Sequence, residues 1–215
     1  MNSMNAPTPG FTDAAATWDR RFSASGYLFG TEPNAWLLEH AHRWHAGQRV
    51  LCVADGEGRN SVFLADRGLI VDAFDISEVG VRKARDFARI TGVKVNFAVA
   101  DVARLAWPES LYDGVVAIFI QFADPQLRQR IFHGMVRCLK PGGLLVLQGY
   151  TPKQLDYRTG GPGIESHLYT ATQLREAFAG MEILELREYE DELAEGAGHR
   201  GHSALVGLVA RKPLA

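Results

Sequence analysis

The chain has 215 residues, 47% of them hydrophobic and 22% charged, with a formal net charge of −2. This length and hydrophobic content are typical of one soluble globular domain with a full core. The small net charge argues against a nucleic-acid or anionic-membrane surface, because both need clustered lysine and arginine. No apolar run reaches the ~20 residues that span a bilayer, and the N-terminus lacks the basic-then-apolar order of a signal peptide. We therefore expect a cytoplasmic protein.

The first 46 residues are predicted to form a helical cap ahead of the main domain, residues 47–215. A helix is expected over 13–22, followed by the loop "SASGYLFGTEP". A second helix should begin near Pro33, because proline suits a first helical turn, and it should bury Trp36 and Trp44.

Strands and helices alternate in the main domain. The predicted strands are "RVLCVA", "LIVDAFD", "KVNFAVAD", "YDGVVAIFI" and "LLVLQGY". Helices are expected at "RNSVFLADRG", "EVGVRKARDFARI" and "QLRQRIFHGMVRCL", the first two ending at Gly68 and at Thr91-Gly92 and the third starting after a cap at Asp124-Pro125. This order is typical of a parallel sheet with right-handed crossovers.

The last third of the chain differs. A Gly- and Pro-rich connection, "TPKQLDYRTGGPGIESHLY", has the length of a functional lid. The capping box "TATQ" opens a short helix, and "EILELREYE" and "SALVGLVARK" are joined too closely for a helical crossover. The predicted fold class is α/β, a Rossmann-like doubly wound sheet of about seven strands, five parallel plus a C-terminal antiparallel hairpin.

The two cysteines, Cys52 and Cys138, lie in the apolar stretches "RVLCVA" and "MVRCLK". They form neither a disulfide framework nor a metal-ligand spacing. We expect both to be reduced and buried, and we expect no metal.

The turn "ADGEGRN" lies between the first strand and its helix, where backbone N–H groups and the helix dipole face a ligand. Gly56 and Gly58 permit a close backbone approach or a positive φ. A dinucleotide-binding turn needs a third glycine, but Ser61 stands there, and Asp55 and Glu57 would repel a pyrophosphate. The turn suits a cationic ligand without phosphate, and S-adenosylmethionine, with its ammonium and sulfonium, is such a ligand.

Two more acids follow strand ends. Asp75 ends the second strand, at the spacing where a carboxylate meets ribose hydroxyls. Asp101 follows the third strand and can accept from an adenine amino group, with Ile76 and Val102 on either side of the ring. Ligands of open α/β sheets gather outside the carboxyl ends of the strands, where all three acids would point.

These landmarks, "VLCVADGEGRN", "VDAFDIS", "VADV", "YDGVV" and "LKPGG", resemble the class I S-adenosylmethionine-dependent methyltransferases. Within that class, "GYLFGTEPNAWL", "GRNSVFLA" and "GHRGHSALVGLVARKP" look closest to the tellurite-resistance and thiopurine-type small-molecule methyltransferases. Cys52 and Ala54 depart from the family, which has an acid and a glycine there. Asp55 is expected to take over the contact with the methionine ammonium.

The resemblance implies S-adenosylmethionine as cofactor, with S-adenosylhomocysteine as product. The implied cofactor-binding residues are Tyr27, Gly30, Ala54, Asp55, Gly56, Glu57, Gly58, Asn60, Asp75, Ile76, Ser77, Asp101, Val102, Ile118 and Phe119. Ile118 and Phe119 should flank the methionine portion. Tyr27 and Phe29 either cover the sulfonium with their aromatic faces or pack the N-terminal helices.

His199 and Arg200 are the predicted catalytic residues. If "EILELREYE" runs parallel to the first five strands, the loop "DELAEGAGHRGHS" overhangs the pocket. Arg200 would attract an anionic substrate, and His199 would orient it or accept a proton. The lid should bring further side chains from another side, namely Arg158, Glu165, His167 and Tyr169.

The predicted activity is methyl transfer to a small-molecule acceptor, a soft nucleophile such as a thiol or a chalcogen oxyanion, by a monomer or homodimer. A non-catalytic S-adenosylmethionine-binding sensor or partner subunit is an alternative. A nicotinamide dehydrogenase is a second alternative, against which the missing third glycine counts.

Overall fold

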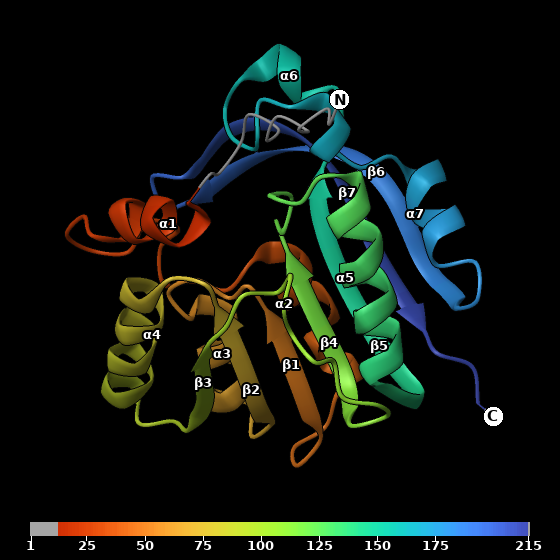
Figure 1. Cartoon of the computed structure of the whole chain (residues 1–215), viewed down its shortest axis with the longest axis horizontal. Helices are drawn as coiled ribbons and strands as arrows, with labels where there is room; N and C mark the ends of the chain where they lie inside the picture. The colour runs from red at the N-terminus through yellow and green to blue at the C-terminus, as the bar shows by residue number, and fades with distance from the viewer. Residues whose placement is uncertain (1–12, 215) are drawn as a thin grey trace, which may run out of the picture.

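The computed structural model describes residues 13–214, and in these residues a seven-stranded sheet runs in the order β3-β2-β1-β4-β5-β7-β6. Figure 1 shows the sheet with helices packed on both of its faces. β1 to β5 pair in parallel, and β7 is antiparallel to both β5 and β6. The predicted fold class, five parallel strands followed by an antiparallel hairpin, is confirmed.

The strands are short in the first half of the sheet and long in the hairpin. Their bounds are β1 Arg49–Val53, β2 Ile70–Asp75, β3 Val95–Val99, β4 Tyr112–Ile118, β5 Leu139–Tyr150, β6 Glu182–Glu195 and β7 His199–Arg211.

The helices fall close to their predicted positions. Their bounds are α1 Ala14–Phe22, α2 Ala35–His40, η1 Ala41–Arg43, α3 Arg59–Asp66, α4 Glu78–Thr91, α5 Pro125–Cys138, α6 Gln154–Tyr157, η2 Glu165–His167 and α7 Ala171–Ala177. The Asp124 side chain accepts from Leu127 N–H at the start of α5, and Thr170 forms the predicted capping box of α7. The second helix begins near Pro33 as expected, but Asn34 is the N-cap of α2, so Pro33 precedes the helix and does not lie in its first turn.

The sheet separates two hydrophobic cores. On β1, Val50 and Cys52 face the core that contains Trp36, whereas Leu51 and Val53 face the other. α2 and α3 lie behind the sheet in Figure 1, and α5 and α7 lie in front. Cys52 and Cys138 are buried free thiols, as predicted.

The hairpin is longer than predicted. The stretch expected to be a loop, "DELAEGAGHRGHS", is mostly strand, and only residues 196–198 connect β6 to β7. Burial alternates through the added part, since Leu193 is buried between exposed Glu192 and Ala194. β6 runs parallel to β5, so its end does lie at the carboxyl edge of the parallel strands.

The helices of the predicted N-terminal cap pack at two separate places on the main domain. α1 packs against α4, and α2 packs against β5 from the rear core. Residues 1–12 of the predicted cap lie outside the described part of the chain. Among the described helices, none combines the length and the apolar character that a membrane crossing requires.

Candidate cofactor and substrate site

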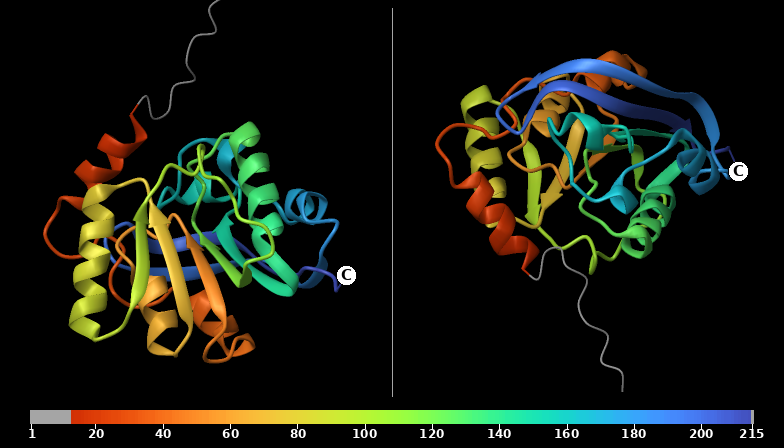
Figure 2. Two further views of the ribbon diagram at one scale, coloured as in Figure 1. Left: turned by 60° about the horizontal axis from the view of Figure 1, so that its bottom comes forward. Right: turned by 90° about the horizontal axis from the view of Figure 1, so that it is seen from above.

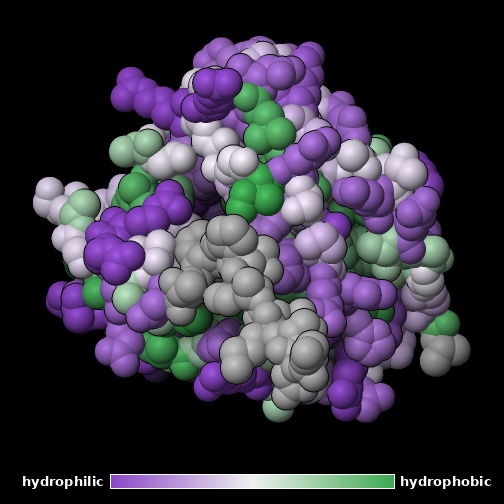
Figure 3. Space-filling model, turned by 45° about the horizontal axis from the view of Figure 1, so that its top comes forward, coloured by the Kyte–Doolittle hydropathy of each residue, from purple (hydrophilic) through white to green (hydrophobic). Residues whose placement is uncertain are grey.

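A cavity of about 410 Å³ opens at the carboxyl ends of the parallel strands. In Figure 2, seen from above, α1 and the lid segment (residues 151–169) lie over this edge, and the hairpin runs along one side. The surface at this edge is largely hydrophilic, with hydrophobic side chains gathered in a few patches (Figure 3). Both the position and the volume are typical of small-molecule sites in open α/β sheets.

The structure brings most of the predicted site residues together in the wall of this cavity. Those that line it are Ala54, Asp55, Gly56, Asn60, Asp75, Ile76, Asp101, Val102, Ile118, Phe119 and His199.

The glycine turn after β1 is held tightly to its surroundings. Ala54 has a φ of 49°, in the left-handed region that favours glycine. Gly56 N–H donates to Asp75 Oδ2 at 2.9 Å. Gly58 has a φ of 90°, and a Cβ there would lie 2.8 Å from Ala84 Cβ, so this glycine allows α3 to approach α4.

Asp55 is the acid of the turn that faces the cavity. Ser61 Oγ donates to its carboxylate. Burial is the largest influence on Asp55, and it raises the pKa of this carboxyl to about 7. A bound ammonium group would favour the ionised form of this carboxyl.

Asp75 is fixed by the backbone around it. Its two carboxylate oxygens accept from Gly56 N–H and Ser77 N–H, each at 2.9 Å. Burial raises the pKa of this carboxyl as well, and the backbone donors oppose that shift.

Glu57, in contrast, faces away from the cavity. It is buried, accepts from Leu28 N–H at 2.7 Å and forms an ion pair with Lys83. Tyr27 packs beside it on Phe87, with ring centroids 5.4 Å apart. The prediction that Glu57 and Tyr27 contact the cofactor is therefore not supported, because both are used to attach the N-terminal loop to α4.

Three other predicted residues support the site without lining it. Gly30 lies against the hairpin, where a Cβ would lie 3.4 Å from Gly196 N. Ser77 accepts from Gly80 N–H at 3.0 Å and caps α4. Gly58 allows the helix contact described above.

Arg200 lies on the opposite side of β7 from His199. Because successive strand residues face opposite ways, a buried His199 leaves Arg200 exposed. The expectation that Arg200 attracts the substrate inside the pocket is therefore not supported. It depended on a flexible loop where the chain forms a strand.

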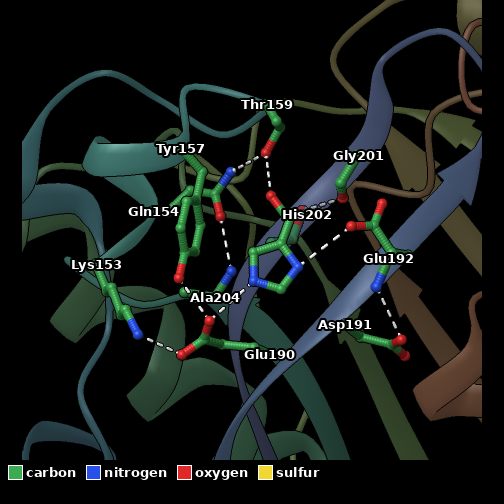
Figure 4. A network of polar contacts seen from close by, with 11 residues as sticks. Lys153, Gln154, Tyr157, Thr159, Glu190, Asp191, Glu192, Gly201, His202 and Ala204 are labelled. Atoms are coloured by element: carbon green, nitrogen blue, oxygen red, sulfur yellow. Dashed lines mark hydrogen bonds and ion pairs between the residues drawn. The ribbon is translucent and has the colours of Figure 1, made fainter.

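Hydrogen bonds and ion pairs connect the lid to the hairpin on the outer surface (Figure 4). Glu190 of β6 contacts Lys153, the Tyr157 hydroxyl at 2.5 Å and His202 Nε2 at 2.9 Å. Gln154 accepts from Ala204 N–H at 2.8 Å. His202, which ends with Ser203 the stretch expected to overhang the pocket, belongs to this surface network.

Arg59 is a cavity residue that the sequence analysis did not single out. It opens α3, is 7% exposed, and its Nη2 donates to Glu195 Oε2 at 2.6 Å. Its Nη1 is buried with no hydrogen-bond partner among the described residues. The signal available in the sequence was an arginine directly after the glycine turn.

The lid contributes one of its four expected side chains to the cavity. His167 lines it and is buried, with no partner for Nδ1 within residues 13–214. Tyr169 is buried beside Phe132 in the core, and Arg158 and Glu165 are exposed.

His199 is enclosed by aromatic rings. Its imidazole stacks between Phe29 and Phe119, with centroids 4.4 Å and 4.3 Å away. The Tyr150 hydroxyl lies 2.5 Å from its Nδ1. Burial, then the nearby charge of Arg59, lowers the pKa of His199 to about 3. A neutral imidazole with so low a pKa is a poor proton acceptor, which argues against the base role considered for it.

The cavity thus has two parts. We call the part at the ends of β1 to β3 the cofactor half, formed by Asp55, Gly56, Asp75, Ile76, Asp101 and Val102. We call the part under the lid and hairpin the acceptor half, formed by Phe29, Phe119, Tyr150, His167 and His199.

Comparison with known proteins relates the chain to methyltransferases. Residues 50–143 match a family described as a methyltransferase domain. A curated relative, 27-O-demethylrifamycin SV methyltransferase of Amycolatopsis mediterranei, is 30% identical over 163 residues, covering 74% of this chain and 56% of the relative. The chain therefore spans only about half the length of this relative.

Solved structures share the fold. One such structure concerns the conversion of a disulfide bond into a thioacetal group during echinomycin biosynthesis. It has a TM-score of 0.73 and 18% sequence identity, and the match covers 93% of this chain and 92% of that chain. The N-methyltransferase NodS of Bradyrhizobium japonicum WM9, in complex with S-adenosyl-L-homocysteine, has a TM-score of 0.70 and 14% identity, covering 93% and 98%. TehB of Haemophilus influenzae has a TM-score of 0.68 and 18% identity, covering 92% and 66%.

Residues 50–143 thus match a methyltransferase-domain family, and the chain shares the fold of solved S-adenosylmethionine-dependent methyltransferases. The residues of the cofactor half fit that cofactor. Asp55 is a carboxyl whose ionisation a cation would favour, and Asp75 is fixed at a strand end where ribose hydroxyls bind. Ile76 and Val102 supply apolar surface for an adenine ring.

Proposed function

We propose that the protein transfers a methyl group from S-adenosylmethionine to a small-molecule acceptor whose attacking atom is a soft nucleophile, a thiolate or a chalcogen oxyanion. The observation that carries this proposal is the division of one cavity into an acidic half, suited to a cationic nucleoside, and an aromatic half in which the His199 imidazole is a poor proton acceptor. When bound, the cofactor supplies an electrophilic methyl group on a sulfonium.

In the cofactor half, each side chain has a defined task. Asp75 would hold the ribose hydroxyls, and its own position is set by Gly56 and Ser77 N–H. Asp55 would meet the ammonium of the amino-acid end, and Asp101 would accept from the adenine amino group. Together these side chains would bind and orient the cofactor.

In the acceptor half, the rings of Phe29, Phe119 and Tyr150 exclude water and limit the acceptor to a small molecule. The leaving group of a sulfonium displacement departs neutral, so the chain has little need to supply an acid. A soft nucleophile that is already ionised needs no base either, in contrast to a neutral amine or hydroxyl. Trp18, Arg21 and Phe29 line the cavity, which supports the proposed role of the N-terminal helices as a cap.

The structural relatives leave several acceptor types open. The names given above include an N-methyltransferase, a demethylrifamycin methyltransferase and a protein that acts at a disulfide. The echinomycin case concerns sulfur chemistry, and the likeness to TehB supports the tellurite-resistance type as the proposed subtype.

The proposal is tested by incubating the protein with S-adenosylmethionine and each of four acceptor kinds: small thiols, selenite or tellurite, primary amines, and alcohols. S-adenosylhomocysteine and the methylated product are measured by mass spectrometry. We expect turnover with the first two kinds only. Tight cofactor binding without turnover on any acceptor would instead favour the non-catalytic sensor.

A further inference from the structure

We propose that Tyr150 is a positioning residue: its hydroxyl holds the His199 ring in the tautomer that carries the proton on Nε2, so that a neutral N–H donor faces the acceptor. This inference rests on the proposed function, since it says how the acceptor is recognised. It changes the role of His199 from a base to a hydrogen-bond donor.

The geometry leaves the ring little freedom. His199 opens β7 and is 7% exposed, and its imidazole is stacked between Phe29 and Phe119 at interplanar angles of 23° and 24°. A Cβ on Gly198 would lie 2.3 Å from Phe29 Cε1, so the hairpin backbone presses directly on this stack. The His199 ring therefore cannot rotate toward solvent or out from between the rings of Phe29 and Phe119.

Hydrogen-bond accounting fixes the tautomer. Tyr150 is 1% exposed, and the one partner of its hydroxyl within residues 13–214 is His199 Nδ1, at 2.5 Å. If Nδ1 carried the proton, the buried phenol O–H would have no acceptor, which is costly in a protein interior. When Tyr150 donates, Nδ1 is the acceptor and the proton of the neutral ring is on Nε2.

Burial and nearby charge keep the ring neutral. Burial most strongly opposes a second proton on His199, and the charges of Arg59 and Arg21 act in the same direction, so its pKa falls to about 3. Tyr150 stays protonated because burial raises the pKa of its phenol. Nε2 makes no hydrogen bond to any described residue, although His199 lines the cavity. This N–H is thus available to a ligand.

An N–H donor recognises a lone pair and cannot remove a proton. The acceptor that this arrangement favours therefore enters already ionised, as a thiolate or an oxyanion of a small acid, and donates its electron pair without a base from His199. At saturating cofactor, the pH dependence of turnover should then follow the pKa of the acceptor rather than that of His199.

The tautomer can be measured without any activity. In ¹⁵N-histidine-labelled protein, the His199 signals are assigned by comparison with His199→Gln, and long-range ¹H–¹⁵N spectra show which ring nitrogen carries the proton. We expect protonated Nε2 and unprotonated Nδ1 from pH 6 to pH 9. Tyr150→Phe should give a mixture of tautomers, whereas Tyr157→Phe, on the outer surface of the lid, should change nothing. A proton on Nδ1 in the wild type, or an unchanged tautomer in Tyr150→Phe, overturns the proposal.

The role as donor is tested by two substitutions. Gln can place an N–H near the Nε2 position but is not a base, whereas Ala offers neither. With a thiol acceptor, His199→Gln should keep kcat/KM within about 10-fold of wild type, and His199→Ala should lose about 100-fold. Equal loss in both variants, with unchanged binding of S-adenosylhomocysteine, would contradict the donor role. Absence of turnover in the wild type would refute the proposed function, while the spectra would still decide the tautomer.

Discussion

The two halves of the cavity are built in different ways. The cofactor half takes its acidic groups from residues at the ends of parallel strands or within two residues of them, so each is positioned by its own strand. The acceptor half collects residues from the N-terminal loop, the end of β4, β5, the lid and the hairpin. One half is therefore determined by local segments and the other by the tertiary packing of distant ones.

The difference has a chemical side too. The cofactor half is acidic, with Asp55, Asp75 and Asp101 around a nucleoside-sized space, whereas the acceptor half is aromatic and carries two imidazoles. A common cofactor needs the same contacts in many proteins, but the acceptor differs from one enzyme to another. Three experiments test how far the halves are separable.

The largest effect is expected where the halves meet, at the ion pair between Arg59 and Glu195, whose side chains are 8% and 10% exposed. Glu195→Ala leaves a buried arginine without its partner, so the free energy of unfolding should fall by about 3–5 kcal/mol in urea denaturation. Glu192→Ala is the control on the same strand, because its side chain is 72% exposed and paired only with His202. Similar losses in both variants would show that the buried pair does not join the halves.

An intermediate effect is expected within the cofactor half. Asp75→Asn keeps the shape of the side chain but removes the charge that would meet the ribose hydroxyls, and calorimetry should show S-adenosylhomocysteine binding weakened about 100-fold. Asp86→Asn, on the exposed face of α4, serves as the control. If Asp75→Asn lowered turnover while cofactor affinity stayed the same, the assignment of this half would be wrong.

A smaller effect concerns the ionisation of Asp55. Its pKa is about 7 in the folded chain, against the ordinary aspartate value of 3.8, so the folded state keeps a proton that the unfolded state releases between these values. The free energy of unfolding should therefore decrease as the pH rises from about 4 to about 7. Because the Asp55 side chain is only partly buried, solvent screens it, and the expected decrease in the free energy of unfolding is on the order of 2 kcal/mol. Denaturation of wild type and Asp55→Asn at several pH values checks this, and parallel curves would contradict it.

The same contrast explains what the sequence could predict. Alternating strands and helices, the caps at Asp124 and Thr170, and the acids after β2 and β3 are local patterns, and the structure shows all of them. From the sequence alone, Asp55 and Glu57 are two acids of the same turn, and nothing local distinguishes which one faces the cavity. Only the position of Lys83 on α4 decides that Glu57 is neutralised away from the cavity.

The hairpin shows the same limit. "GHRGH" was correct as a place where the chain approaches the pocket, but the choice between His199 and Arg200 depends on where β7 begins. A one-residue difference in that start reverses which side chain faces inward. Tyr150 and Arg59 were not found, because their roles depend on His199 and Glu195, which are distant in sequence.

The seam between the N-terminal loop and the hairpin has a consequence for biosynthesis. Leu28 C=O accepts from Ala197 N–H at 2.9 Å and Gly198 N–H at 3.0 Å, so an early segment and a late one close over the pocket together. While the ribosome is still adding the lid, the first five strands can already pair. The hairpin of β6 and β7, which contacts the N-terminal loop over the pocket, has not yet been made. A nascent chain should thus acquire its ligand only after β7 has emerged, which makes S-adenosylhomocysteine retention a reporter of completed folding.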